Sequence, residues 1–254
     1  MKFASLGSGS KGNATIIDTE NGCLMIDCGF SIKETTRRLE RVGKSPQDIS
    51  AILVTHEHSD HWKGVLPFAS KFSIDVYATA GCYRAVNVSP TTSKLLKVIC
   101  SHSGFMINNV HVLPIPVPHD ANEPVQYIFS YDQYRLGILT DVGNITPYIV
   151  EKYNNCSGLL VEANHDIELL QAGAYPKFLK DRVAGQWGHL NNHQTASLLS
   201  AIDQQSIQKL VIGHISESNN NSARVKQAIE GVFTRSEKII YANQNEGFDW
   251  VYLS

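Results

Sequence analysis

Short apolar runs alternate with amphipathic segments along the whole chain, and this pattern predicts strands with helices between them. The expected strands are residues 14–19, 23–27, 51–55, 76–78, 96–100, 110–117, 127–131, 136–140, 158–162, 209–212 and 249–253. The expected helices are residues 32–42, 65–71, 82–88, 145–153, 194–202 and 223–232. Because strands and helices alternate in both halves, we expect an α+β fold of two face-to-face sheets with helices outside. No repeat or linker divides the sequence, so we predict a single domain over residues 1–254.

Metal-capable side chains stand where several of the predicted strands end. They are Asp27, His119, Asp141, Glu162 and His214. An isolated Asp at a strand end is usually a turn former. If these strands are neighbours, however, the five side chains converge on one rim of the sheets. Their number therefore favours a shared site over five separate turns.

The densest group of such side chains lies at residues 56–61, directly after the strand expected at 51–55. Alternation along an extended chain points His56 and His58 to the same side, so both imidazoles can reach one metal ion. Asp60 and His61 follow after the strand has ended and can face a second ion beside the first. Imidazole and carboxylate are common ligands of zinc and similar divalent metals. The spacing favours a metal site over the alternative, a solvated histidine-rich turn.

The bulk composition is that of an ordinary globular protein, with 43% hydrophobic residues, 18% charged residues and a net charge of −2. This charge gives no global basic field, so a polyanion would have to be bound locally. The five cysteines are odd in number and form no C-x-x-C motif, which indicates a reducing compartment. The sequence shows no signal peptide and no apolar stretch near the roughly 20 residues that span a bilayer. We therefore expect a cytoplasmic protein without a membrane partner.

Several segments together resemble a known family. They are the glycine-rich segment 7–13, the H-x-H-x-D-H motif at 56–61, and residues 26–29, 117–120, 140–143, 162–166, 188–192 and 213–216. On these segments the chain resembles the metallo-β-lactamase superfamily over nearly its whole length. Within it, the chain is similar to the short bacterial nucleases of the YycJ/WalJ type, with phosphodiesterases related to ribonuclease Z as broader kin. Asn191 departs from the pattern, in which a serine is expected.

The resemblance implies a four-layer αββα sandwich with two divalent ions on its rim, and the ligand types accept zinc, manganese and iron alike. The first ion would take three histidines: His56, His58 and His119. The second would take Asp60, His61 and His214, and His189 or His165 could compete for the place of His214. Asp141 would bridge the two ions. Asp27, and with it Glu162, would orient ligands by hydrogen bonding.

Two divalent ions about 3.5–4 Å apart can share a hydroxide that forms well below the pKa of bulk water. The expected activity is therefore metal-dependent phosphodiester hydrolysis, and the resemblance narrows it to a DNA exonuclease acting in the 5′ to 3′ direction. Besides Asp60, the candidate catalytic residues are His189 and His165, which would protonate the leaving oxygen or contact phosphate. A structural histidine is the alternative for each of these two.

The segment before His189 mixes charge with aromatic faces, which suits a backbone phosphate and a stacked base. Its candidate substrate contacts are Arg182 and Lys180, near Tyr175 and Trp187; an ordinary surface helix is the alternative. Ser10 and Asn13 could also lie close to substrate, because glycines allow tight backbone approach, although a plain hairpin turn would look the same. The segment 7–13 lacks the strand–helix context of a P-loop, so no nucleotide cofactor is expected.

Other members of the superfamily perform other reactions, so the ligands alone leave rival functions open. The main alternatives are a small-molecule cyclic phosphodiesterase and a thioester hydrolase of the glyoxalase II type. A non-enzymatic metal-binding protein is the rival from another class. The expected partner is nucleic acid, in the first place DNA, and the sequence leaves the oligomeric state open.

Overall fold

The computed structural model describes residues 1–88 and 92–254, and two seven-stranded sheets form its centre. In spatial order, the first sheet consists of β14 (Phe248–Tyr252), β1 (Lys2–Gly7), β2 (Ala14–Thr19), β3 (Gly22–Ile26), β4 (Ile49–Leu53), β5 (Asp75–Thr79) and β6 (Leu96–Ile99). The second sheet consists of β13 (Ile239–Tyr241), β12 (Lys209–Gly213), β11 (Gly158–Glu162), β10 (Tyr134–Leu139), β9 (Val125–Tyr131), β8 (Val110–Pro116) and β7 (Phe105–Ile107). Strands β3 to β6 are parallel to one another, as are β10 to β13.

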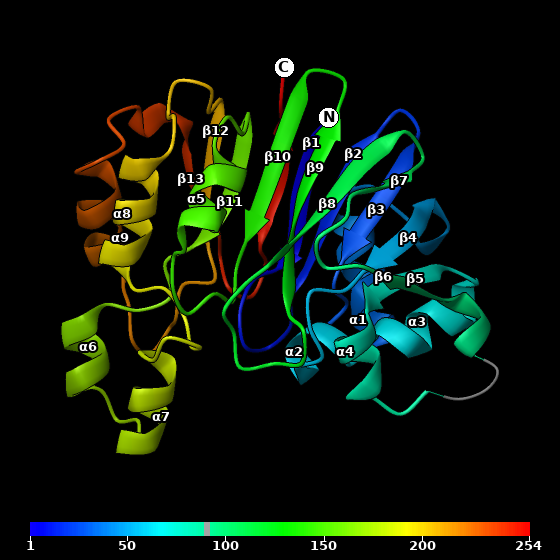
Figure 1. Cartoon of the computed structure of the whole chain (residues 1–254), viewed down its shortest axis with the longest axis horizontal. Coiled ribbons are helices and arrows are strands. Elements are labelled where there is room, and N and C mark those ends of the chain that lie inside the picture. Colours follow the sequence, from blue (N-terminus) through cyan, green and yellow to red (C-terminus); the bar gives the residue numbers. More distant parts are fainter. Residues whose placement is uncertain (89–91) are drawn as a thin grey trace.

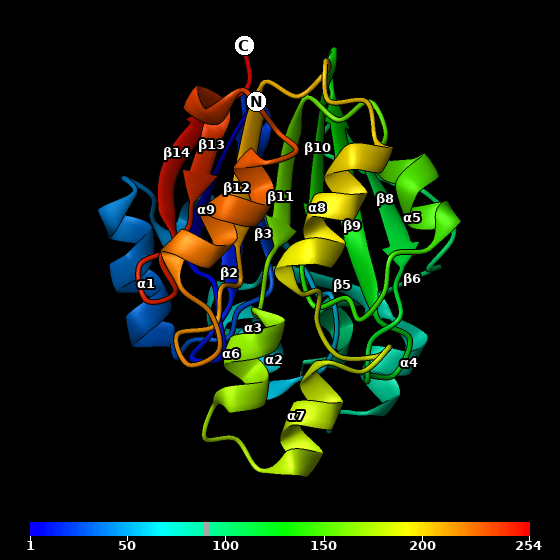
Figure 2. The ribbon, with the colours of Figure 1, turned by 90° about the vertical axis from the view of Figure 1, so that its left-hand side faces the viewer.

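Nine helices lie outside the two sheets in the described part of the chain, some on their outer faces and some at one end of the sandwich (Figures 1 and 2). They are α1 (Ile32–Arg41), α2 (Ser59–Trp62), α3 (Val65–Phe72), α4 (Ala80–Arg84), α5 (Pro147–Tyr153), α6 (Ile167–Ala172), α7 (Lys177–Val183), α8 (Asn192–Ala201) and α9 (Ser222–Glu230), with short 3-10 turns at Pro46–Asp48, Ser93–Leu95 and Ser236–Lys238. Figure 1 shows α1 and α3 on the side of the first sheet and α5, α8 and α9 on the side of the second. In both views α6 and α7 lie below the end of the sandwich. Among the described residues, no helix is long and apolar enough to cross a membrane.

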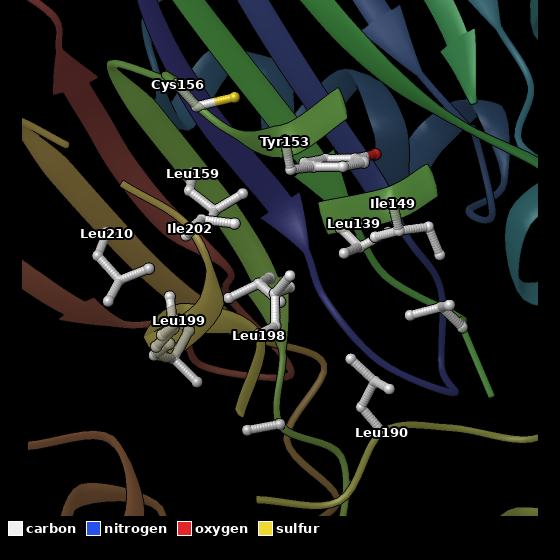
Figure 3. Packing of buried hydrophobic residues seen from close by; sticks show 14 of the residues in the cluster. Leu139, Ile149, Tyr153, Cys156, Leu159, Leu190, Leu198, Leu199, Ile202 and Leu210 are labelled. Atoms are coloured by element: carbon white, nitrogen blue, oxygen red, sulfur yellow. The ribbon is translucent and has the colours of Figure 1, made fainter. Parts of the chain in front are cut away.

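Alternation along the strands divides the core into three layers. In β11, Leu159 and Val161 pack against the outer helices, whereas Leu160 points between the two sheets. Successive side chains of a strand face opposite sides, so a strand covered on both faces must be apolar throughout. Figure 3 shows the outer layer of the second sheet, where Leu159 and Leu210 meet Leu198 of α8 and Tyr153 of α5. The αββα sandwich expected from the sequence is thus confirmed.

Some elements differ from the sequence prediction. The strand β1 was not predicted, because its Ser5 and Gly7 interrupt the apolar pattern; the buried Ser5 hydroxyl is satisfied by the carbonyl of Gly7 at 3.0 Å. The helix expected at 82–88 begins at Ala80, where Thr79 caps it by accepting from the N–H of Cys82, and it ends at Arg84. Helix α6 was also missed, and a surface helix in the segment of α7 was only the alternative to a run of substrate contacts. Only Leu170 of α6 and no residue of α7 is buried, so they lack an apolar stripe.

The carboxyl ends of the central strands meet at one rim, and three of them end in the same backbone turn. Asp27 follows β3 with φ 59°, Asp141 follows β10 with φ 52°, and His214 follows β12 with φ 51°. Non-glycine residues adopt this left-handed conformation seldom, and it often marks functional positions. Each turn stops the strand abruptly and leaves a polar side chain at the rim.

Helix α1 is bonded to the turn at residues 243–247, which connects β13 to β14. Arg38 donates to the carbonyls of Leu6 and Asn245, and Glu34 accepts from its Nε at 2.6 Å. The hydrogen bonds donated by Arg37 and Arg38 outweigh partial burial and lower the pKa of Glu34 to about 2. The basic side chains of this helix therefore stabilise the structure through these bonds, and they also form a solvated surface.

We expect Glu34→Gln to lower the free energy of unfolding by at most about 1 kcal/mol at neutral pH, since solvent screens this half-exposed ion pair. A carboxylate whose pKa is lowered by folding stabilises the protein fully above its unfolded pKa. The difference between the two proteins should therefore persist down to about pH 4.5 and close as the pH falls towards 2. Denaturant titrations at stepped pH measure it, and a difference that grows in acid would contradict the assignment.

Candidate metal centre

Helix α2, which carries Asp60 and His61, is held against the turn that follows β3. The N–H of Cys28 donates to the carbonyl of His61 at 2.9 Å. A Cβ atom on Gly29 would lie 1.8 Å from the carbonyl oxygen of Asp60, so only glycine permits this approach of the two backbones. Backbone packing therefore fixes where Asp60 and His61 stand.

Asp27 orients His61 from the inside of the protein. Its carboxylate accepts from the backbone N–H and the hydroxyl of Thr55, both at 2.8 Å, and from Nδ1 of His61 at 2.8 Å. This bond leaves Nε2 of His61 as the nitrogen available to a metal. Burial opposes a charge on the ring, but the carboxylates of Asp141 and Asp27 raise the pKa of His61 to about 10, so a metal ion that binds Nε2 would displace a proton.

His56, His58 and His119 form one half of the centre. Their ring centroids lie 4.5 to 5.1 Å apart, and Nδ1 of His119 donates to the carbonyl of Gly188 at 3.1 Å. Burial lowers the pKa of His56 and of His119, so these rings are neutral. A neutral imidazole offers the lone pair that a metal requires.

Asp141 stands between this half and the other histidines. Its Oδ2 lies 3.4 Å from Nε2 of His61, and its Oδ1 lies 3.7 Å from Nδ1 of both His189 and His214. Although burial acts to raise it, the positive charges of His214 and His61 hold the pKa of Asp141 well below its usual range. The carboxylate is therefore ionised.

Glu162, at the end of β11, orients His189 and His214 by hydrogen bonds. Its Oε1 accepts from the backbone N–H groups of Val142 and Leu190, both at 3.0 Å. Its Oε2 accepts from Nδ1 of His214 at 3.0 Å and of His189 at 3.2 Å. Burial would raise the pKa of Glu162, but these contacts, above all with His189, lower it to about 2.

In the described part of the chain, three groups of possible ligands have all their ligand atoms within 4.8 Å of one another. They are His56, His58 and His119; His56, His61 and Asp141; and Asp141, His189 and His214. Asp60 belongs to none of these groups, and its Oδ2 lies 3.6 Å from Nε2 of His61. The structure thus brings the predicted ligands to one place. It also places His189 beside His214, and the sequence analysis had named His189 as a competitor for the place of His214.

The unsatisfied atoms of the centre test whether metal ions fit. Among the described residues, Nε2 of His56, Nε2 of His119 and Oδ2 of Asp141 are buried without a hydrogen-bond partner. Leaving such atoms unpaired costs about 1–3 kcal/mol each, whereas a divalent cation would satisfy all three. The donor set of imidazole and carboxylate therefore fits divalent metal ions.

A pocket of about 220 Å³ opens over the centre. One wall consists of His58, Asp60, His119, Asp141, His189 and His214. The lining also includes Ser10, Asn164, Ser216, Asn219 and Gln244, together with Tyr175, Leu179, Arg182 and Val183 in or near α7. A charged or polar substrate group can therefore reach the candidate ligands directly from solvent.

The predicted substrate contacts fall in different places. Ser10 and Arg182 line the pocket, and Nε of Arg182 donates to Asp120 at 2.5 Å. Lys180 instead donates to the carbonyl of Gln171 at 2.6 Å, away from the pocket wall. Asn13 is buried, and its amide nitrogen lies 2.9 Å from Nε2 of His61 and 3.2 Å from Oδ2 of Asp60. Its contacts are therefore with candidate ligands.

His165 is buried under the centre and is not among the residues that line the pocket. Neither of its ring nitrogens has a partner among the described residues, and burial lowers its pKa to about 4. Its backbone forms an isolated bridge with Asn191. This placement gives no contact through which His165 would reach a substrate.

Several residues that line the pocket were not singled out in the sequence analysis, among them Asp120 and Gln244. Asp120 directly follows the candidate ligand His119, and Gln244 lies in the turn between β13 and β14, where its carbonyl accepts from the N–H of Ser8 at 3.2 Å. Gly9 makes room for Gln244, because a Cβ there would lie 2.1 Å from the Gln244 side chain. No motif surrounds Gln244, so only the fold could have revealed it.

Comparisons with known proteins agree with this geometry. The model of a β-lactamase superfamily domain matches residues 23–215. The chain is 34% identical over 228 residues to exodeoxyribonuclease WalJ of Streptococcus pneumoniae, covering 87% of this chain and 83% of that protein. It is 30% identical over 236 residues to exodeoxyribonuclease YycJ of Bacillus anthracis, covering 91% and 89%.

Solved structures show the same fold. The metallo-β-lactamase fold protein YhfI of Bacillus subtilis superposes with a TM-score of 0.75 over 98% of both chains, at 12% sequence identity. Such low identity carries the fold alone, but the family model and the two relatives extend the likeness to the sequence. The chain therefore belongs to the metallo-β-lactamase superfamily, in the group that includes WalJ and YycJ.

Proposed function

We propose that this protein is a metal-dependent exodeoxyribonuclease that shortens DNA from a 5′ end, with residues 1–254 acting as a single domain. The similarity to WalJ and YycJ, which spans at least 83% of each chain, carries this proposal. The pocket supports it, because convergent imidazole and carboxylate groups line it together with other polar side chains. The protein would act in the cytoplasm, where its five cysteines would stay the free thiols that the structure contains.

Two divalent ions, zinc, manganese or iron, would be held by the imidazoles and carboxylates already described. His56, His58 and His119 would hold one ion, Asp60, His61 and His214 the other, with Asp141 between them. When bound, the ions would lower the pKa of a water molecule and offset the charge of the phosphate. Asp27 and Glu162 would keep His61 and His214 oriented towards them.

His189 is the candidate for proton transfer to the leaving oxygen. It lines the pocket, and 22% of its side chain is exposed, whereas His214 beside it is buried. The bond from its Nδ1 to Glu162 fixes the ring and leaves the second nitrogen for the substrate. Exposure therefore separates the two roles: His214 is a ligand, and His189 serves as a general acid.

Arg182 supplies a cation at the mouth of the pocket. More than half of its side chain is exposed, and the bond to Asp120 holds the guanidinium beside His119. A guanidinium in this place can bind a phosphate of the DNA backbone. Ser10 also lines the pocket and can donate to a phosphate there.

The test uses protein stripped of metal with a chelator and then supplied with Mn²⁺ or Zn²⁺. The substrates are end-labelled single- and double-stranded DNA and RNA, together with closed circular DNA as a matched control without ends. We expect Mn²⁺ to restore stepwise shortening of DNA from the 5′ end, while circular DNA stays intact.

Three outcomes contradict the proposal. Nicking of the circle would indicate an endonuclease, and full activity without metal would exclude the metal centre. Hydrolysis restricted to a small cyclic phosphodiester or a thioester would assign the pocket to one of the rival reactions.

A further inference from the structure

A second groove lies beside the pocket of the metal centre. Its volume is about 250 Å³, and it is lined by Asp120, Asp181, Arg182, Gly185, Gln186 and Trp187. Asp120 and Arg182 line both hollows, so their ion pair forms the ridge between them. A chain molecule that binds in the pocket can therefore continue into the groove.

Trp187 lines this groove. Its backbone is hydrogen-bonded to the rest of the protein, whereas its side chain is exposed. Its carbonyl accepts from the N–H of Asp120 at 3.0 Å, and the next residue, Gly188, accepts from Nδ1 of the candidate ligand His119. Yet the side chain is largely in solvent, with 61% of the residue exposed. The indole therefore lies outside the core, although the residue next to it in the chain, Gly188, contacts a candidate metal ligand.

The charges of the groove favour a neutral ligand. Asp120 is paired with Arg182, and Asp181 is paired with Lys177 at 2.7 Å. Because each carboxylate is paired with one cation, the groove has no excess positive charge to attract a phosphate in addition to the one in the pocket. A flat uncharged group can instead stack on the indole, and base–aromatic stacking of this kind is common in proteins that bind single-stranded nucleic acid.

We propose that this groove binds one base of the substrate strand, stacked on Trp187, while the neighbouring phosphate occupies the pocket. The inference rests on the proposed function and adds a requirement to it. A base stacked on Trp187 leaves its duplex partner, so the enzyme acts on a strand whose end is single-stranded or locally opened. Arg182 on the ridge would contact the phosphate between the two hollows.

The experiment removes the aromatic ring and the base separately. Trp187→Ala and Trp187→Phe are compared with the wild type on single-stranded oligonucleotides that carry an abasic residue at one of the first three positions. Phe178→Ala is the matched control, because Phe178 is an exposed aromatic of α7, at 74%, that lines neither hollow.

For the wild type we expect kcat/KM to fall about tenfold or more when the base at one particular position is missing. Trp187→Ala should show the same loss on the intact strand and no further loss on the abasic one, Trp187→Phe should recover most of the activity, and Phe178→Ala should behave as the wild type. The inference is overturned if no abasic position matters, or if Trp187→Ala slows intact and abasic strands equally. A wild type that degrades no DNA would instead refute the proposed function.

Discussion

Replacing Asp141 with asparagine should abolish most of the hydrolysis while the protein stays folded. The carboxylate lies 3.4 Å from Nε2 of His61 and 3.7 Å from Nδ1 of His214, so both halves of the centre share its charge. Asparagine keeps the shape and accepts the left-handed backbone at this position, φ 52°. We expect the rate on end-labelled DNA to fall by more than the roughly 10–100-fold that loss of an outer partner of a ligand costs.

A matched control is available at Asp132, which has the same backbone conformation, φ 51°, in the exposed turn between β9 and β10. Asp132→Asn makes the same chemical change far from the rim and should leave the rate unaltered. Metal content and the rate are measured on both variants. If Asp141→Asn retained both ions and the wild-type rate, Asp141 would have no place in the centre.

Glu162→Gln should weaken metal binding and the fold together. The two oxygens of Glu162 accept four hydrogen bonds, two from backbone N–H groups and two from His189 and His214. Glutamine has the same shape, but its NH₂ group must face two donors whichever way it turns. We expect a loss of about 10–100-fold in metal affinity and of about 2 kcal/mol or more in unfolding free energy.

Metal titration and denaturant titration of the apoprotein separate these two effects. The control is Glu151→Gln on α5, where 69% of the glutamate side chain is exposed and its only charged partner is the adjacent Lys152 among the described residues. This variant should change neither quantity by a measurable amount. An unaltered metal affinity in Glu162→Gln would show that Glu162 does not orient a ligand.

The strands could be predicted wherever burial on both faces makes them apolar throughout. The segment 158–162 was predicted with its observed bounds, because Leu159, Leu160 and Val161 all enter a core layer. Helix α8 was predicted over residues 194–202 and begins two residues earlier, at Asn192, because the Asn191 side chain caps it by accepting from the N–H of Gln194. A side-chain cap at Asp166 stabilises α6, and an exposed ion pair between Lys177 and Asp181 stabilises α7. Such features leave no periodic apolar pattern in the sequence.

The metal centre was predictable to the extent that its ligands follow strand ends or share one motif. The hydrogen bonds that support the ligands were harder to predict, because they depend on side-chain geometry. Examples are the bond between Asp27 and His61 and the bonds between one oxygen of Glu162 and both His189 and His214. The ridge of Asp120 and Arg182 joins residues 62 positions apart, and nothing local in the sequence marks it. The roles assigned to His165 and Lys180 stay predictions, and their surroundings in the structure do not favour them.

The left-handed turns at Asp27, Asp141 and His214 also determine how the centre can open. Because each of these residues lies within two residues of a strand end, the side chains are attached next to the hydrogen-bonded ladder and not to a long loop. Segments in the interior of a sheet exchange with the unfolded state only when much of the molecule opens. The positions of these three side chains should therefore persist without metal until the sandwich unfolds cooperatively, so that an apoprotein stripped of its ions keeps this part of the centre in place for rebinding.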